Sequence, residues 1–136
     1  MTYKMSREEL LKLHGELCTE AVELMKKKNH DYAGKGGSEP FANFTRVEAM
    51  GITATEKGML VRMTDKMSRL SSFTESGKFA VCDEKLVDTI LDMINYSVLF
   101  YAYMLEKQTQ AEEKQTTKPM FLVEDPSHPI NIQKID

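Results

Sequence analysis

Three segments of the chain repeat apolar residues at the three- and four-residue spacing of an α-helix. The first, from Leu10 to Leu24, follows the stretch Ser6–Glu9, whose serine and glutamate are spaced as in a capping box. The second opens on the similar stretch Thr53–Glu56 and runs to about residue 72. The third runs from about Asp83 to Lys107 and is apolar nearly all round in its second half. These patterns predict three long helices, the third being the central and most buried one.

The remaining stretches are less regular. The long connection from Asn29 to Ile52 holds four glycines, and its part from Phe41 to Met50 is compatible with a short extra helix. Beyond Lys107 the chain is polar, and residues 119–136 contain three prolines among scattered apolar residues. We expect this tail to lie extended along the helices, with disorder as the alternative. The fold class is therefore predicted as all-α: a helical bundle over residues 1–107, followed by a linker and an extended C-terminal tail over 108–136.

Composition narrows the function. A chain of 136 residues is long enough for one domain with a core of its own. A net charge of −3 argues against general nucleic-acid binding, which needs an excess of positive charge. The longest nearly apolar run, Val98–Leu105, is too short to cross a membrane. We therefore expect a soluble, cytoplasmic protein.

A row of acidic and amide side chains marks the third predicted helix. Asp88, Asp92 and Asn95 follow one another at steps of four and three, which places them on one face. Two carboxylates one turn apart repel each other when desolvated, so protons, lysines or a cation must offset the charge. Mg²⁺ or Mn²⁺ would suit these oxygens. The alternative is the polar edge of an amphipathic helix.

The second predicted helix carries a matching basic row. Arg62, Lys66 and Arg69 have the same spacing, again on one face. A basic row opposite an acidic row is what a site for phosphate and a metal ion needs. Ordinary salt bridges between the two helices explain the pattern equally well.

Two glutamates are further candidate metal ligands. Glu56 falls on the apolar side of the second helix, although its place in a capping box explains it as well. Glu20 lies three residues before Glu23, which is the spacing of a metal-binding pair, and also that of a solvated helix face.

The long connection has features of a ligand-binding loop. Its glycines permit close approach of the backbone to a ligand, and Tyr32 and Phe44 could stack on a base. Asp31 or Asn43 could then bind the edge of that base. A surface loop with two packing aromatic rings is the alternative.

Four motifs, taken in order, resemble one protein family. Residues 28–32 (Lys-Asn-His-Asp-Tyr), 40–44 (Pro-Phe-Ala-Asn-Phe), 66–70 (Lys-Met-Ser-Arg-Leu) and 88–96 (Asp-Thr-Ile-Leu-Asp-Met-Ile-Asn-Tyr) resemble the signature of the nucleotide-modification-associated domain 1 proteins. Those proteins occur largely in phages and bacteria. The resemblance covers about residues 24–103. The family in turn resembles, more remotely, the MazG-like all-α nucleoside triphosphate pyrophosphohydrolases.

The resemblance implies a Mg²⁺-dependent (deoxy)nucleoside triphosphate pyrophosphohydrolase that forms a homodimer or tetramer. The metal would be held by Asp88 and Asp92, which would also be the catalytic residues, together with Glu56 or Glu20. The MazG-like pattern on this helix is Glu-x-x-Asp, whereas the two acids here are spaced as Asp-x-x-x-Asp, from Asp88 to Asp92. The implied substrate-binding residues are Asp31, Tyr32, Lys35, Asn43, Phe44, Arg62, Lys66, Arg69, Asn95 and Tyr96. The rival hypotheses are a nucleotide-binding protein without turnover and a structural module of a phage.

Overall fold

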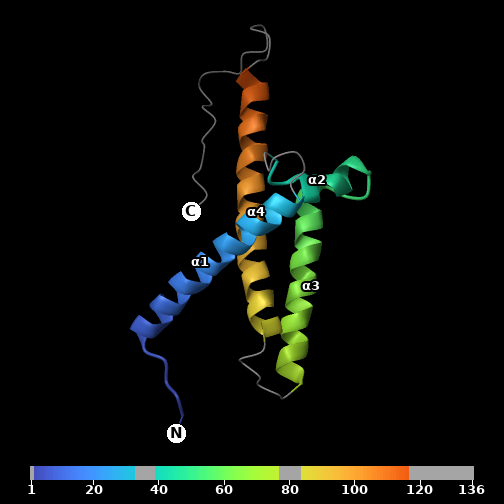
Figure 1. Cartoon of the computed structure of the whole chain (residues 1–136). Helices are drawn as coiled ribbons and strands as arrows, with labels where there is room; N and C mark the ends of the chain where they lie inside the picture. Colours follow the sequence, from blue (N-terminus) through green and yellow to red (C-terminus); the bar gives the residue numbers. More distant parts are fainter. Residues whose placement is uncertain (1, 33–38, 77–83, 117–136) are drawn as a thin grey trace, which may run out of the picture. The chain divides into compact units, whose positions relative to one another are not determined.

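The computed structural model describes residues 2–32, 39–76 and 84–116, the side chains of 29–32 and 84 excepted. Within these ranges the secondary structure consists of four α-helices without any strand: α1 (Arg7–Tyr32), α2 (Ala42–Ala49), α3 (Thr55–Glu75) and α4 (Glu84–Thr116) (Figure 1). The all-α class is thus confirmed, and the narrower likeness to MazG-like bundles stays a prediction.

The chain divides into two compact units, Met1–Met104 and Leu105–Asp136. Helix α4 continues to Thr116, through most of the polar stretch after Lys107 that the sequence predicts to be a linker. The predicted extended tail falls outside the described residues. Among the described helices, no segment combines the length and the hydropathy that a membrane span requires.

The start of α1 follows the predicted capping box. The backbone N–H of Ser6 donates to Oε2 of Glu9 over 2.7 Å, and the N–H of Glu9 donates to Oγ of Ser6 over 3.1 Å. These reciprocal bonds satisfy two of the amide groups that a helix start leaves open. The capping box at Ser6 is therefore confirmed.

A tight turn joins the predicted short helix α2 to α3. Gly51 has a φ of +73°, which a residue without Cβ adopts readily. Its N–H donates to the carbonyl of Glu48, and the N–H of Ile52 donates to that of Val47, both over 2.9 Å, as in a Schellman motif. On α3, a Cβ at Gly58 would lie 3.0 Å from Cγ2 of Val47. The two glycines thus let α2 fold back closely onto α3.

The second predicted capping box, in Thr53–Glu56, is wrong. Helix α3 begins at Thr55, its N-cap is Ala54, and no side chain caps it. Instead, the hydroxyl of the fully buried Thr55 donates to Oε2 of Glu48 over 2.8 Å. The start of α3 thus carries a tertiary contact with α2 in place of the predicted local cap.

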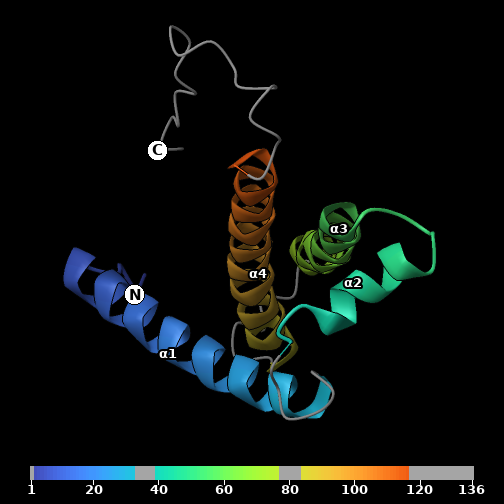
Figure 2. The ribbon, with the colours of Figure 1, turned by 90° about the horizontal axis from the view of Figure 1, so that it is seen from above.

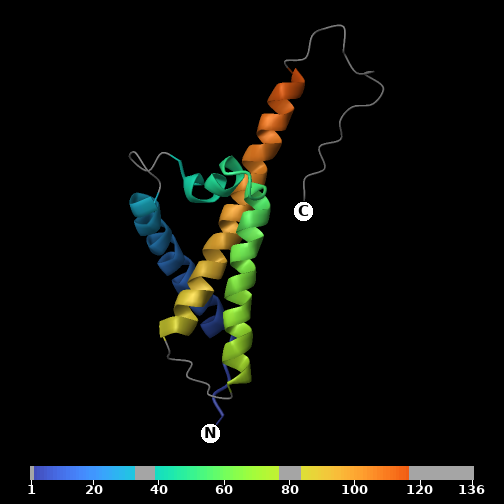
Figure 3. The same ribbon diagram turned by 90° about the vertical axis from the view of Figure 1, so that its right-hand side faces the viewer.

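Helix α4 lies between α1 on one side and α3 on the other, as expected of the central helix (Figures 2 and 3). Each helix of the first unit contributes one buried apolar side chain to the core: Ala21, Phe44, Met59 and Leu91. The apolar second half of α4 is less buried than predicted, because Val98, Tyr101 and Met104 are exposed in the single chain.

Candidate functional site

A cavity of about 320 Å³ opens within the first unit, where all four helices contribute to its wall. Helix α3 and helix α4 supply most of its polar groups, and α2 with the turn before it supplies aromatic and amide groups. The lining residues are Met25, Lys28, Pro40, Asn43, Phe44, Arg62, Lys66, Asp92, Asn95, Tyr96 and Leu99. Seven of the residues that the sequence singled out are thus brought together here.

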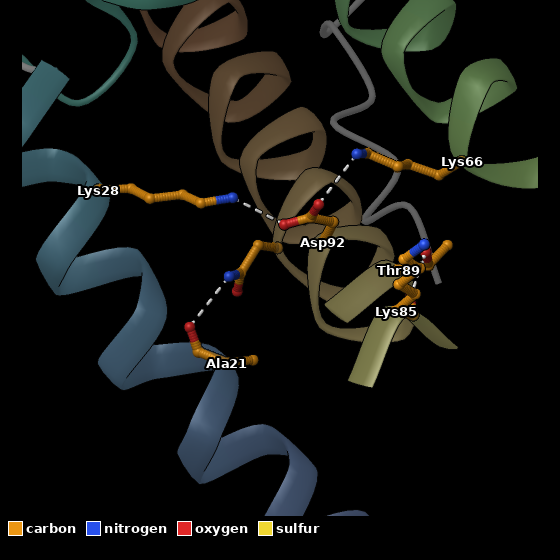
Figure 4. Close-up of polar contacts among 7 residues, drawn as sticks. Ala21, Lys28, Lys66, Lys85, Thr89 and Asp92 are labelled. Atoms are coloured by element: carbon orange, nitrogen blue, oxygen red, sulfur yellow. Dashed lines mark hydrogen bonds and ion pairs between the residues drawn. The ribbon is translucent and has the colours of Figure 1, made fainter. Parts of the chain in front are cut away.

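Asp92 is held between two lysines from different helices (Figure 4). Nζ of Lys28 on α1 lies 2.7 Å from Oδ1, and Nζ of Lys66 on α3 lies 3.0 Å from Oδ2. The side chains of Asp92 and Lys66 are only 15% and 12% exposed, whereas that of Lys28 is 43% exposed. Two lysines therefore offset the charge of this carboxylate.

The surroundings of Asp92 act on its pKa in opposite directions. Burial raises the pKa, because a carboxylate loses hydration. The hydrogen bonds from Lys28 and Lys66, together with their charges, lower it more, so the pKa of Asp92 lies below the usual value. The group is consequently an anion over the whole neutral range, and its charge holds the two ammonium groups at the cavity wall.

Asn95 has a structural contact that the sequence did not reveal. Its Nδ2 donates to the carbonyl oxygen of Ala21 on α1 over 3.0 Å, and its side chain is buried. One amide N–H of this predicted substrate-binding residue is therefore committed to joining α4 to α1.

Aromatic rings and a guanidinium form the other side of the cavity. The rings of Phe44 and Tyr96 meet edge to face with centroids 6.0 Å apart. The guanidinium carbon of Arg62 lies 5.1 Å from the centroid of the Phe44 ring, within the range of a cation–π interaction. This stacking orders Arg62, and the cavity residue Tyr96 adds a second aromatic surface.

A second hollow, of about 610 Å³, lies between the later part of α3 and the start of α4. Asp88 and Arg69 line this hollow and not the first, while Asp92 lines both. Arg69 also contacts Asp65 over 3.4 Å in an exposed pair on its own helix. The predicted basic row is therefore divided, with Arg62 and Lys66 at the first cavity and Arg69 at the second.

The four predicted metal ligands do not form one set. Glu56 lies ten residues before Lys66, about 15 Å along α3, and the exposed Glu20 lies eight residues before Lys28, about 12 Å along α1. In the part of the chain that the structure describes, no three histidine, cysteine, aspartate or glutamate side chains gather as metal ligands. Asp88 and Asp92 alone remain one helical turn apart.

Three predicted binding residues, Asp31, Tyr32 and Lys35, have side chains outside the described residues. Sequence reasoning in turn missed Lys28 as a cavity residue, because its position suits the negative end of a helix. A signal was present: Lys28 continues the spacing of Ala21 and Leu24, so it is a charge on the apolar stripe. Met25, Pro40 and Leu99 carried no chemical signal.

The cavity thus combines three cationic side chains, one carboxylate, two amides and two aromatic rings. Such a wall can bind an anion that carries a planar group. Comparisons of the chain with protein-family models, curated proteins and solved structures gave no match.

Proposed function

We propose that the cavity binds a nucleoside phosphate. Ammonium and guanidinium groups of Lys28, Lys66 and Arg62 supply donors for phosphate oxygens. Phe44 and Tyr96 offer aromatic surface to a base, and Asn43 can donate to or accept from its edge. The volume of about 320 Å³ falls within the range of small-molecule sites.

The observation that carries this proposal is the excess of positive charge at the wall. Three cations face one carboxylate in a chain whose net charge is −3, so the cavity is locally opposite in sign to the protein as a whole. Electrostatic attraction in such a concave site concentrates an anionic ligand. The aromatic groups then favour a nucleotide over a simple anion.

Calorimetry with a panel of ribo- and deoxynucleotides, including base-modified ones, tests the proposal. We expect one or more nucleotides to bind, and Lys66→Met to weaken that binding. Lys57→Met is the matched control, because Lys57 is exposed on the same helix and its loss changes the net charge equally. If no nucleotide binds, or if both variants weaken binding alike, the cavity is not a nucleotide site.

Turnover is the second candidate, and the arrangement of Asp88 favours it. Asp88 lies one turn from Asp92, and the second hollow also contains Arg69 and Lys85. A pyrophosphohydrolase would need acidic and basic groups of this kind near the phosphates. Release of pyrophosphate from a triphosphate in the presence of Mg²⁺ or Mn²⁺ would establish the activity, and Asp88→Asn should abolish it. Binding without any release would leave a nucleotide-binding protein.

We also propose that the chain forms a homo-oligomer, either a dimer or a tetramer. Val98 and Tyr101 are exposed on α4, and Leu10 and Leu13 are exposed on the N-terminal half of α1. Exposed apolar side chains that neighbour one another are typical of an interface between protein chains. Light scattering should give a multiple of the 15.5 kDa chain mass, and Val98→Glu should lower it while Ser97→Glu does not. A monomer at micromolar concentration contradicts this proposal.

A further inference from the structure

The contacts of Asp92 bear on how a phosphate would be held, provided that the proposed nucleotide site is correct. Both carboxylate oxygens face an ammonium group, Oδ1 that of Lys28 and Oδ2 that of Lys66 (Figure 4). The two lysines reach Asp92 from opposite neighbouring helices, α1 and α3. The carboxylate therefore lies behind two cations that belong to the cavity wall.

This arrangement is unfavourable for a divalent cation at Asp92. The cation would have to displace two ammonium groups from the oxygens, and it would then lie beside two positive charges. The nearest acidic neighbour on the same face, Asp88, lines the other hollow. On the side of the first cavity, the ligand therefore meets lysine and arginine rather than a carboxylate pair.

The lysines retain the capacity to bind a ligand. An ammonium group has three N–H donors, so donation to Asp92 leaves further donors for phosphate oxygens. Lys28 is 43% exposed, which makes its ammonium accessible, and the guanidinium of Arg62 lies over the ring of Phe44. Three cations thus line one cavity, Lys28 from α1 and Arg62 with Lys66 from α3.

We propose that Asp92 is a positioning residue that holds Lys28 and Lys66 at the wall, so that the ligand's phosphate is bound directly by these cations without a divalent metal ion. Direct binding to ammonium groups is strongest when the phosphate carries its full negative charge. Mg²⁺ in solution would mask part of that charge and compete with the protein. The site therefore differs from the Mg²⁺-dependent one that the sequence predicts.

The first test compares two conditions for the unsubstituted protein. Calorimetric titrations with ATP, dATP and inorganic pyrophosphate are carried out in EDTA and in excess Mg²⁺. We expect binding in EDTA to be at least as tight as in Mg²⁺. Binding that requires Mg²⁺ overturns the inference while leaving a nucleotide site in place. Absence of binding to the whole nucleotide panel in both conditions overturns the proposed function, and this inference with it.

The second test asks whether Asp92→Asn weakens or tightens the binding of the ligand. If the carboxylate only repelled an anion, Asp92→Asn would tighten binding, because one negative charge is removed. If it positions the lysines, Asp92→Asn weakens binding in EDTA, despite the lost repulsion. Circular dichroism verifies that the variant is folded. The comparison of EDTA with Mg²⁺ uses the unsubstituted protein and does not depend on this variant. Tighter binding by Asp92→Asn contradicts the positioning role.

The third test isolates Lys28. Loss of a hydrogen bond between charged groups corresponds to a weakening of about 10- to 100-fold, and Lys28→Met should show this in EDTA. Lys27→Met, its exposed neighbour, removes the same charge away from the cavity and should change affinity less than about threefold. Affinity of Lys28→Met should also depend less steeply on salt than that of the unsubstituted protein. Equal affinities for the two variants refute direct binding by Lys28.

Discussion

Replacing Asp92 by alanine would leave a nearly buried ammonium group without its counter-charge. The side chain of Lys66 is 12% exposed, so water solvates its ammonium poorly once the carboxylate is gone. Removing one partner of a buried ion pair costs about 3–5 kcal/mol, whereas an exposed pair contributes about 0–1 kcal/mol. Because Asp92 retains 15% exposure, we expect Asp92→Ala to lower the free energy of unfolding by about 2–3 kcal/mol.

The cost of replacing each of the two lysines should increase with the burial of its side chain. Lys66→Met leaves Asp92 paired with Lys28, so its expected cost is about 1–2 kcal/mol. Lys28→Met should cost less than about 1 kcal/mol, since that side chain is 43% exposed. Glu23→Ala is the control for an exposed pair, because Glu23 pairs with the exposed Lys26 on its own helix, and it should cost less than about 0.5 kcal/mol.

Urea unfolding followed by far-UV circular dichroism gives these values from the midpoint and slope of each transition. All variants are compared at one protein concentration, because self-association would shift the apparent stability. The reasoning fails if Asp92→Ala costs no more than Glu23→Ala, or if Lys28→Met is more damaging than Lys66→Met. Either result would mean that the ion pairs on Asp92 are not formed as the structure shows them.

Three further predictions concern single residues. Because the pKa of Asp92 is lowered in the folded chain, its charge stabilises the fold fully above about pH 4 and progressively less as the pH falls through the folded pKa. The difference in unfolding free energy between the unsubstituted protein and Asp92→Asn should therefore be constant above about pH 5 and shrink below about pH 4. Asn95→Ala should cost about 1–2 kcal/mol in urea unfolding, since it removes the buried hydrogen bond to Ala21, and a neutral result would contradict that bond. Gly15→Ala should raise the melting temperature, because a Cβ meets nothing within 4 Å on an exposed helix and gains up to about 1 kcal/mol of helix propensity. Gly51→Ala should lower the melting temperature, because φ is +73° at this position. A change in melting temperature of the same sign for both glycine variants would contradict this prediction.

Local signals in the sequence predict the helices well, and they fail where a tertiary contact intervenes. The two hydrogen bonds of the cap join Ser6 and Glu9, which lie three residues apart, so their spacing is sufficient to predict the cap. Thr53 and Glu56 have the same spacing, but α3 begins at Thr55, whose hydroxyl contacts Glu48 on a different helix. Propensity rules contain no information on such a partner. The end of α4 at Thr116 was underestimated because a polar composition indicates exposure and does not exclude a helix.

In the candidate site, too, local spacing predicts some features, while others depend on tertiary contacts. Spacing placed Asp88, Asp92 and Asn95 on one face of the helix, because this depends only on the geometry of an α-helix. Asp92 and Asn95 line the first cavity, whereas Asp88 lines only the second hollow. Which of them contacts a ligand and which contacts α1 depends on how the helices are rotated against each other. That rotation decides that Arg69 faces the second hollow and that Lys28 reaches Asp92. Neither contact follows from one helix taken alone.

The cluster around Asp92 is difficult to explain by stability alone. Apolar side chains of similar volume in place of a buried ion pair are often neutral, or stabilising by about 1–4 kcal/mol. Leu91 and Leu99 on the same helix show that α4 otherwise presents apolar groups to its neighbours. Under the proposed function, the two lysines and the arginine at the cavity have a role in binding an anion in addition to their contacts with Asp92 and Phe44. A ligand at one hundred times its dissociation constant would stabilise the folded chain by about 2.7 kcal/mol, which is comparable to what an apolar cluster would contribute. The stability that is lost by having charges instead of apolar groups at the cavity is thus similar in size to the stability that a bound phosphate would add.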